Sequence, residues 1–242
     1  MKIYFLVPVY NEADNIPELA NSLHSKLTEY TKFFVFVDDK STDTTVDVIK
    51  QNFPESNLHI ITKEQNAGPG DSFNVGFEWI LSNSKDATDV VVTLEGDNTS
   101  DKNLLPTLVS ISQLGFDMVL ASPYAQGGGF SKTSFFRKAI SFIANMFFRT
   151  FFNVKILTLS SFYRLYTVEL IRQIKNSNPK IIAEKGFICM LEILLKAIAL
   201  KARIIEVPMV LHSDVRKGKS KMKIVKTSLE YFKFFIRYRA SK

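Results

Sequence analysis

Acidic side chains recur where short apolar segments end in the first hundred residues. Tyr10-Asn11-Glu12, Asp38-Asp39 and Glu95-Gly96-Asp97 each follow a run rich in Val, Ile and Phe. Carboxylate oxygens are hard ligands that suit Mg²⁺ or Mn²⁺, and an acid-x-Asp pair can hold a metal that itself binds a diphosphate. In an extended segment, Glu95 and Asp97 point to the same side. A single acid here is more often a turn or helix cap, so the metal prediction depends on the three clusters together.

The elements that must position these acids alternate along the first half of the chain. Strands are predicted at residues 2–10, 33–39, 58–64 and 89–98, and helices at 13–30, 46–52 and 72–82. This order predicts an α/β fold with a mostly parallel central sheet and helices on both faces. Ligands bind such sheets beyond the carboxyl ends of the strands. We therefore expect the three acidic clusters to meet at one rim. Gly68-Pro69-Gly70 fits neither a Walker loop nor the dinucleotide fingerprint.

Composition excludes several classes of protein. The chain has 242 residues, of which 46% are hydrophobic and 23% charged, which is typical of a globular protein. The single cysteine, Cys189, excludes an intramolecular disulfide framework, and three scattered histidines do not indicate a zinc site. The first residues turn polar too early for a signal peptide, and no apolar run reaches the length of about 18 residues that spans a membrane. A cytoplasmic location is expected.

The positive charge is concentrated at the C-terminal end. Ten Lys and Arg and one acid, Glu230, lie between Arg216 and Lys242, although the whole chain has a net charge of +7. The segments SFFRKAISFIANMFFRTFF and SLEYFKFFIRYR both interleave Phe with basic residues at helical spacing. Such segments fit a surface that contacts anionic lipid head groups, and the alternative is a Phe-rich core beside a solvated face. A nucleic-acid binder is the other reading of a basic tail, and the acidic rim argues against it.

The motifs in combination resemble a known family. Val7-Pro8-Val9-Tyr10-Asn11-Glu12, Asp38-Asp39-Lys40-Ser41, Asn66-x-Gly68 and Asn74-x-Gly76 resemble family 2 glycosyltransferases of the GT-A fold. Later segments narrow the resemblance to polyprenyl-phosphate sugar synthases of the dolichol-phosphate mannose synthase type. They are Ala121-Ser122-Pro123-Tyr124, Arg137-x-x-x-Ser141-x-x-x-Asn145, Ser161-Phe162-Tyr163-Arg164, Val207-Pro208 and Gly218-Lys219-Ser220-Lys221. The resemblance covers nearly the whole chain.

The resemblance implies a role for each matching residue. The nucleotide-sugar donor, a GDP- or UDP-sugar, would be bound by Pro8, Tyr10, Glu12, Asp39, Asn66 and Gly68. The divalent metal, Mg²⁺ or Mn²⁺, would be held by Glu95, Asp97 and Thr99. The catalytic residues would be Asp97, Arg137 and Arg216. The phosphate or acceptor would be bound by Ser141 and by Ser220 and Lys221, the last two on a loop that closes over the site.

Three departures from the family pattern stand out. The usual Asp-x-Asp reads Glu95-Gly96-Asp97, and an arginine common in the family is replaced by Pro123. The spacing from Arg216 to the glycine that precedes Ser220-Lys221 is also tighter. A sugar-nucleotide binding protein with weak catalysis therefore stays an alternative.

The resemblance implies an inverting transfer of a sugar to a polyprenyl phosphate, dolichyl or undecaprenyl. An anionic phosphate acceptor needs no strong general base, only screening of charge and stabilisation of the leaving diphosphate. The alternative is a transferase with a glycan or other hydroxyl acceptor, for which Asp214 or Glu184 would be the candidate base.

The predicted organisation is a GT-A domain over residues 1–212, with an amphipathic, possible membrane-surface segment at about 130–157. A basic acceptor loop and a C-terminal amphipathic helix follow at 213–242. Other family members carry transmembrane helices after this region, and this sequence ends there. The prediction is therefore peripheral attachment to the cytoplasmic face of an anionic membrane, with a membrane-anchoring partner protein left open and no nucleic acid as partner.

Overall fold

The structure is a computed structural model that describes residues 1–132, 135–218 and 224–240; for residues 135–140, 224–226, 228, 229, 239 and 240 it describes the backbone alone. The strands are β1 (Lys2–Val9), β2 (Thr31–Asp38), β3 (Leu58–Thr62), β4 (Val90–Thr93), β5 (Met118–Ser122), β6 (Gly129–Ser131), β7 (Arg164–Thr167), β8 (Ile204–Pro208) and β9 (Val210–His212). The α-helices are α1 (Ile16–Ser25), α2 (Thr45–Asn52), α3 (Pro69–Asn83), α4 (Leu105–Gln113), α5 (Phe135–Phe152), α6 (Val168–Ser177), α7 (Cys189–Ala199) and α8 (Ile224–Ala240).

The central sheet is mostly parallel, as the sequence predicts. Its seven strands lie in the order β3-β2-β1-β4-β7-β5-β8, and a second, two-stranded sheet pairs β6 with β9. β1 pairs in parallel with β2 and β4, and β5 with β8. β7 is antiparallel to both of its neighbours, β4 and β5. The reversal places Tyr163 and Arg164 beside the end of β4, next to the acidic segment.

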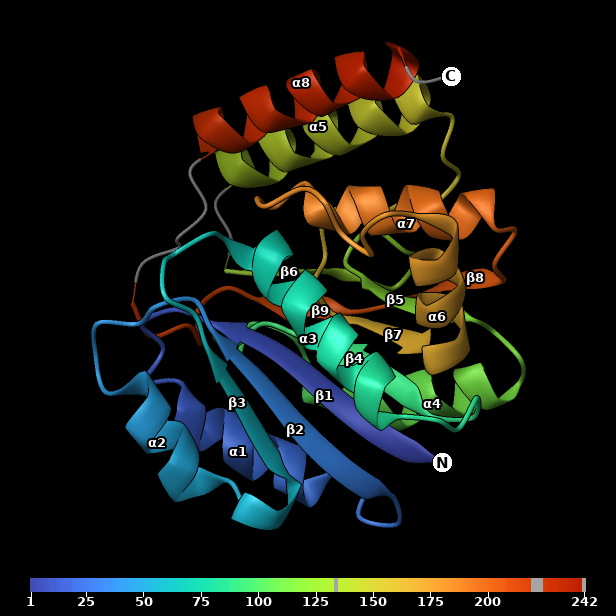
Figure 1. Ribbon diagram of the computed structural model, residues 1–242. Coiled ribbons are helices and arrows are strands. Elements are labelled where there is room, and N and C mark those ends of the chain that lie inside the picture. Colours follow the sequence, from blue (N-terminus) through green and yellow to red (C-terminus); the bar gives the residue numbers. More distant parts are fainter. Residues whose placement is uncertain (133–134, 219–223, 241–242) are drawn as a thin grey trace.

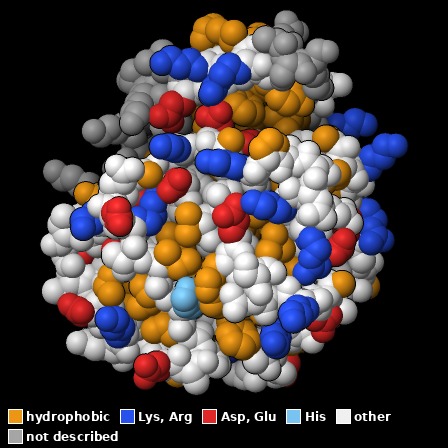
Figure 2. Space-filling model, viewed as in Figure 1, with side chains coloured by type: hydrophobic (Ala, Val, Ile, Leu, Met, Phe, Trp, Pro, Cys, Tyr) orange, Lys and Arg blue, Asp and Glu red, His pale blue; other side chains and the backbone are white. Residues whose placement is uncertain are grey.

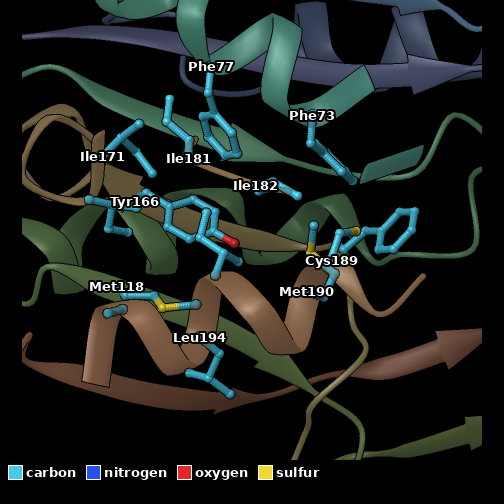
Figure 3. Packing of buried hydrophobic residues seen from close by; sticks show 14 of the residues in the cluster. Phe73, Phe77, Met118, Tyr166, Ile171, Ile181, Ile182, Cys189, Met190 and Leu194 are labelled. Carbon is cyan, nitrogen blue, oxygen red and sulfur yellow. The ribbon is translucent and has the colours of Figure 1, made fainter. Parts of the chain in front are cut away.

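Hydrophobic side chains cover both faces of the sheet. On one face α1, α2 and α4 pack against Phe5, Phe36 and Val92. On the other face α3, α6 and α7 pack against Leu6 and Tyr166, and Figure 1 shows these two helix layers on opposite sides of the strands. Figure 3 shows side chains of α7 and α3 gathered around Tyr166. Burial of so many large apolar side chains is the main stabilising contribution.

Helices α5 and α8 form a third layer outside α7. They lie side by side, far from the sheet (Figure 1). Aromatic pairs join them: Phe148 with Tyr231 at 4.8 Å and Phe151 with Phe235 at 4.5 Å between ring centroids. The two Phe-rich basic segments of the sequence therefore pack against each other. No helix in the described part of the chain is both long and apolar enough to cross a bilayer.

Two helices differ from the sequence prediction at their ends. Helix α1 covers only Ile16–Ser25 of the predicted 13–30, because the Lys32 ammonium binds the carbonyls of Leu23, His24 and Lys26 and so ends the helix. Helix α3 begins at Pro69, three residues earlier than predicted. Proline lacks an N–H but fits the first helical turn, where that group has no intrahelical partner.

Candidate active site

The three acidic clusters meet at one rim of the sheet, as predicted. Val9 at the end of β1 is in register with Asp38 at the end of β2. The Asp39 N–H donates to the Val9 carbonyl at 2.9 Å, and the Leu94 N–H to the Leu6 carbonyl at 3.4 Å. Since β1 lies between β2 and β4, the segments that follow these three strands emerge at the same edge.

On one side of the rim, Asp39 organises the loop that precedes α3. One carboxylate oxygen accepts from the Lys63 ammonium at 2.6 Å and the Ala67 N–H at 2.9 Å, and the other accepts from the Gly68 N–H at 2.8 Å. Asp39 is only 5% exposed. Gly68 has a φ of +93°, and a Cβ there would lie 2.6 Å from the Lys185 carbonyl oxygen. The loop conformation therefore requires glycine.

The segment after β1 is fixed by side chains around α2. Glu12 donates its N–H to the Thr45 hydroxyl at 2.8 Å, and one of its carboxylate oxygens accepts from the Asn15 amide at 2.7 Å. Pro8, Tyr10 and Glu12 are all half-buried at this edge, and Asn66 is exposed. The donor-binding residues predicted from the sequence thus lie in neighbouring segments of one rim. Their contacts with a donor stay predictions.

Asp97 lies at the centre of the rim and is paired with a cation. Its Oδ2 accepts from the Arg216 Nε at 2.6 Å and also contacts the Arg216 Nη2. Its Oδ1 accepts from the Thr99 hydroxyl at 2.7 Å and the Thr99 N–H at 3.1 Å. Asp97 and Arg216 are far apart in the sequence, so the fold brings together two residues predicted to be catalytic.

Glu95 has different partners from Asp97. β4 ends at Thr93, and the segment that follows is a turn with Asn98 at a φ of +65°, so the alternation of an extended strand does not govern these two acids. Glu95 accepts from the Ser100 hydroxyl at 2.6 Å and the Phe162 N–H at 3.3 Å. Burial raises the pKa of Glu95, and the neighbouring Asp97 raises it further.

A buried lysine lies beneath the acidic turn. Lys102 is 8% exposed and donates to the Asn98 side-chain carbonyl at 3.0 Å. Burial lowers the pKa of Lys102 to about 8, although Glu95 and Asp97 oppose that shift. Lys63, Asn15, Ser100 and Lys102 were all missed by sequence reasoning. The signal for Lys63 and Lys102 is a single basic residue beside an acidic strand end, which is too common to be decisive.

The donor set at Asp97 fits a divalent cation that is shared with a ligand. Among the described residues, no three His, Cys, Asp or Glu side chains are grouped to hold a metal. Mg²⁺ is commonly held by one or two carboxylates together with phosphate oxygens of the substrate. The cation beside Asp97, the Arg216 guanidinium, shows that this carboxylate faces positive charge. Glu95 and Thr99 as further ligands stay predictions.

The predicted acceptor residues are only partly described. Ser141 lies on α5, and its hydroxyl is 2.7 Å from the Tyr124 hydroxyl. Arg137 lies in the first turn of α5, and its side chain is outside the described part of the structure. Ser220 and Lys221 lie outside the described residues altogether. Their roles stay predictions from the sequence.

The chain matches a known protein family. The model of the family described as "Glycosyl transferase family 2" matches residues 4–178. The chain belongs to glycosyl transferase family 2. The family resemblance of the motifs around Pro8, Asp39 and Gly68 is confirmed, and the chain is a glycosyltransferase.

Relatives at 26–29% identity carry names in agreement with the narrower resemblance. The undecaprenyl-phosphate mannosyltransferase of Micrococcus luteus is 26% identical over 223 residues, which cover 92% of this chain and 88% of that protein. The polyprenol monophosphomannose synthase of Mycolicibacterium smegmatis is 26% identical over 90% of this chain and 79% of its own length. The dolichol-phosphate mannosyltransferase of Pyrococcus furiosus is 29% identical over 98% of this chain, which spans only 63% of that relative.

Solved structures support the GT-A fold. Glucosyl-3-phosphoglycerate synthase from Mycobacterium tuberculosis, in complex with Mn²⁺, UDP and glucosyl-3-phosphoglycerate, has a TM-score of 0.67 and 15% identity, covering 96% of this chain and 77% of that one. The complex of the same enzyme with Mg²⁺ and UDP also has a TM-score of 0.67, with 14% identity and coverage of 96% and 76%. The likeness concerns the fold.

Proposed function

We propose that this glycosyltransferase moves a sugar, with mannose the first candidate, from a GDP- or UDP-sugar to a polyprenyl phosphate. The observation that carries the proposal is the Asp97–Arg216 pair at the meeting point of the strand ends. It combines a carboxylate suited to a metal-bound diphosphate with a cation suited to phosphate. The names of the relatives in M. luteus, M. smegmatis and P. furiosus support the acceptor class.

In this proposal the rim binds the donor, and its residues need only to hold the metal and to screen the negative charge of the two phosphate-bearing reactants. Asp97, with Glu95 and Thr99 as further candidates, would hold Mg²⁺ or Mn²⁺, which when bound neutralises the leaving diphosphate. Arg216 stands beside the same oxygen of Asp97 and would stabilise phosphate charge. Loops around Asp39 and Glu12 orient the nucleoside. Attack by the acceptor phosphate oxygen opposite the diphosphate inverts the anomeric carbon.

The ion pairs of the two candidate general bases, Asp214 and Glu184, favour a phosphate acceptor over a hydroxyl acceptor. Asp214 is 3.1 Å from the Lys132 ammonium, and its hydrogen bond with Lys132 lowers its pKa. Glu184 is 2.8 Å from the Arg237 guanidinium. The lowered pKa makes Asp214 a weak base, and the Glu184 carboxylate is occupied by its ion pair. A polyprenyl phosphate is anionic at neutral pH and attacks without one.

The outer face of the α5–α8 layer supports contact with a lipid surface. Phe142, Ile143, Met146 and Phe147 on α5 are 43–59% exposed, and Phe232 and Ile236 on α8 are 52% and 53% exposed. Lys233 is exposed on α8, and Figure 2 shows basic side chains beside hydrophobic ones over this layer at the top of the view. Apolar and cationic side chains on one surface fit an anionic bilayer. Peripheral attachment to the cytoplasmic face, with or without an anchoring partner protein, is part of the proposal.

The activity is tested directly with a panel of donors. The protein is incubated with Mg²⁺ or Mn²⁺, an undecaprenyl or dolichyl phosphate in detergent, and radiolabelled GDP-mannose or UDP-hexoses, and the lipid phase is extracted. Label in the lipid that depends on the metal and on the phosphate supports the proposal. Label that appears only on a soluble or glycan hydroxyl acceptor would support the alternative transferase, and donor binding without transfer would support a binding protein.

Membrane contact is tested with vesicles of varied anionic lipid content. The double variant I143S/F147S removes two exposed apolar side chains from α5, and L114S removes one that is 78% exposed at the end of α4, away from this layer. We expect I143S/F147S to sediment less with vesicles, and L114S to sediment like the unaltered protein. Salt should weaken but not abolish binding of the unaltered protein, because only the charged part is screened. Equal sedimentation of all three proteins would remove this part of the proposal.

A further inference from the structure

We infer that Asn15 is a positioning residue for the proposed reaction. Its side-chain amide joins Glu12, which lies at the rim of strand ends, to the backbone of Lys217, the residue after Arg216. The inference rests on the proposed function for its chemical consequence, and on contacts within the rim for its geometry. Asn15 comes just before α1 and is 1% exposed. It was not singled out by its sequence pattern, where it is one of several polar residues after β1.

The Asn15 amide clamps Lys217 at two points. Its Oδ1 accepts from the Lys217 N–H at 3.0 Å, and its Nδ2 donates to the Lys217 carbonyl at 3.1 Å. The same Nδ2 donates to the Glu12 carboxylate at 2.7 Å. A primary amide offers two N–H donors and one carbonyl acceptor. Both kinds of group are used here, so the orientation of the side chain is set by its partners.

The backbone of Asn15 joins the acidic turn to the same point. Its carbonyl accepts from the Asn98 side chain at 2.8 Å, and Asn98 in turn accepts from the buried Lys102 at 3.0 Å. Asn98 lies directly after Asp97 in the chain. Asn15 therefore contacts three segments that each carry a predicted site residue: the segment with Glu12, the turn with Asp97 and the loop with Arg216.

This clamp limits where Arg216 can go. The loop that carries Arg216 is fixed at one end by the hydrogen bond from the His212 N–H to the Thr99 carbonyl at 2.9 Å, and at the other by Asn15 on Lys217. Fixing the backbone of a loop residue in one conformation costs conformational entropy. Two anchored ends reduce the further loss when Arg216 meets phosphate, which is the physical content of preorganisation.

The link to Glu12 makes the clamp responsive to the donor. Asn15 donates from one nitrogen both to Glu12 and to the Lys217 carbonyl. A nucleoside that contacts Glu12 thereby acts on the hydrogen bonds of the Arg216 loop through a single side chain. We therefore expect donor binding to tighten this loop, and the coupling to disappear when the amide is removed.

Hydrogen–deuterium exchange tests the clamp without any assay of transfer. The Lys217 amide, resolved from overlapping peptides, is expected to exchange about tenfold faster in N15A, because it loses a buried acceptor. The control K217A keeps both backbone groups and removes only the lysine side chain, whose ammonium donates to the Asp14 carbonyl at 3.3 Å. Exchange at position 217 in K217A should match that of the unaltered protein.

The second variant, N15D, keeps the shape of the side chain and separates the two halves of the clamp, although its carboxylate faces the Glu12 carboxylate with like charge. An aspartate still accepts from the Lys217 N–H but cannot donate to Glu12 or to the Lys217 carbonyl. Exchange at Lys217 should be intermediate in N15D. GDP or UDP with Mn²⁺ should slow this exchange in the unaltered protein and leave it unchanged in N15D.

The kinetic expectation follows from the lost preorganisation. We expect kcat/KM for sugar transfer to fall about tenfold in N15A, with most of the loss in kcat. Lys217 exchange that is unchanged in a folded N15A would overturn the inference, and so would equal slowing by nucleotide in N15D and the unaltered protein. If exchange changes as expected but no donor is turned over, the clamp stands and the proposed function fails.

Discussion

Replacing Arg216 should strengthen metal binding in the absence of donor, although the same change should weaken sugar transfer. The guanidinium of Arg216 contacts Asp97 Oδ2 through both Nε, at 2.6 Å, and Nη2. Mn²⁺ that binds Asp97 must compete with this cation for the same carboxylate. In R216M the competitor is gone, whereas the aliphatic part of the side chain is largely retained.

The size of the effect follows from the burial of the pair. A hydrogen bond to a charged group contributes about 1.5–3 kcal/mol when it is well buried, whereas an exposed ion pair contributes at most about 1 kcal/mol. The side chains of Asp97 and Arg216 are 11% and 27% exposed, which lies between these limits. A contribution of about 1–2 kcal/mol corresponds to a decrease of roughly 5- to 30-fold in the Kd for Mn²⁺.

Electron paramagnetic resonance of free Mn²⁺ during a titration of donor-free protein measures that Kd. The matched control is R172M. Arg172 lies on α6, distant in the sequence from Asp97 and Arg216, and its guanidinium pairs with Glu169 at 3.0 Å. R172M should bind Mn²⁺ like the unaltered protein. Weaker binding in R216M, or binding equal to that of R172M, would refute the idea that Arg216 competes with a metal at Asp97.

Three further outcomes are expected. D97N should lose Mn²⁺-dependent donor binding and sugar transfer while the far-ultraviolet circular dichroism stays unchanged; transfer comparable to that of the unaltered protein would remove the metal assignment. G68A should lower the free energy of unfolding by about 2–4 kcal/mol in urea titrations, because its Cβ would meet the Lys185 carbonyl in a backbone conformation with positive φ. The control G129A should change the free energy of unfolding little, because no atom lies within 4 Å of the added Cβ. The pKa of Lys102 is lowered to about 8 in the folded protein, so the folded protein binds fewer protons than the unfolded chain between about pH 8 and 10.4. The contribution of Lys102 to the free energy of unfolding should therefore rise with pH across that window, by up to about 3 kcal/mol. In urea titrations at several pH values, K102M should flatten this rise.

The alternation of strands and helices and the meeting of the acidic clusters could be predicted from the sequence. Parallel strands with buried faces leave strong signals, as in Phe33–Asp39 and Val90–Val92, and their carboxyl ends must share an edge. The reversed strand β7 could not be predicted in the same way. It is only four residues long, and Arg164, which is fully buried, looks like a surface residue in the sequence.

Side-chain contacts between segments that are distant in the sequence were the second feature that could not be predicted. Asp97 and Arg216 each matched a family motif, but no pattern shows that the guanidinium contacts this carboxylate. The role of Asp39 in holding a nucleoside stays a prediction, and no pattern in the sequence shows that its two oxygens bind Lys63 and the backbone of the loop at Gly68. Its influence on the donor is therefore expected to pass through that loop. Side-chain contacts of this kind depend on loop conformations that local residue types do not determine.

The place of β7 in the sheet has a consequence for how the chain is made. β4 is completed early in synthesis and pairs with β1, but its other neighbour, β7, is made only at residues 164–167. Until then the growing chain has an open edge at Val90–Thr93, in a strand that is fully apolar apart from its last residue. Open edges of this kind pair readily with other chains. Chains that stall or are cut before residue 164 should therefore aggregate or stay bound to chaperones, whereas chains that have passed it can close the sheet.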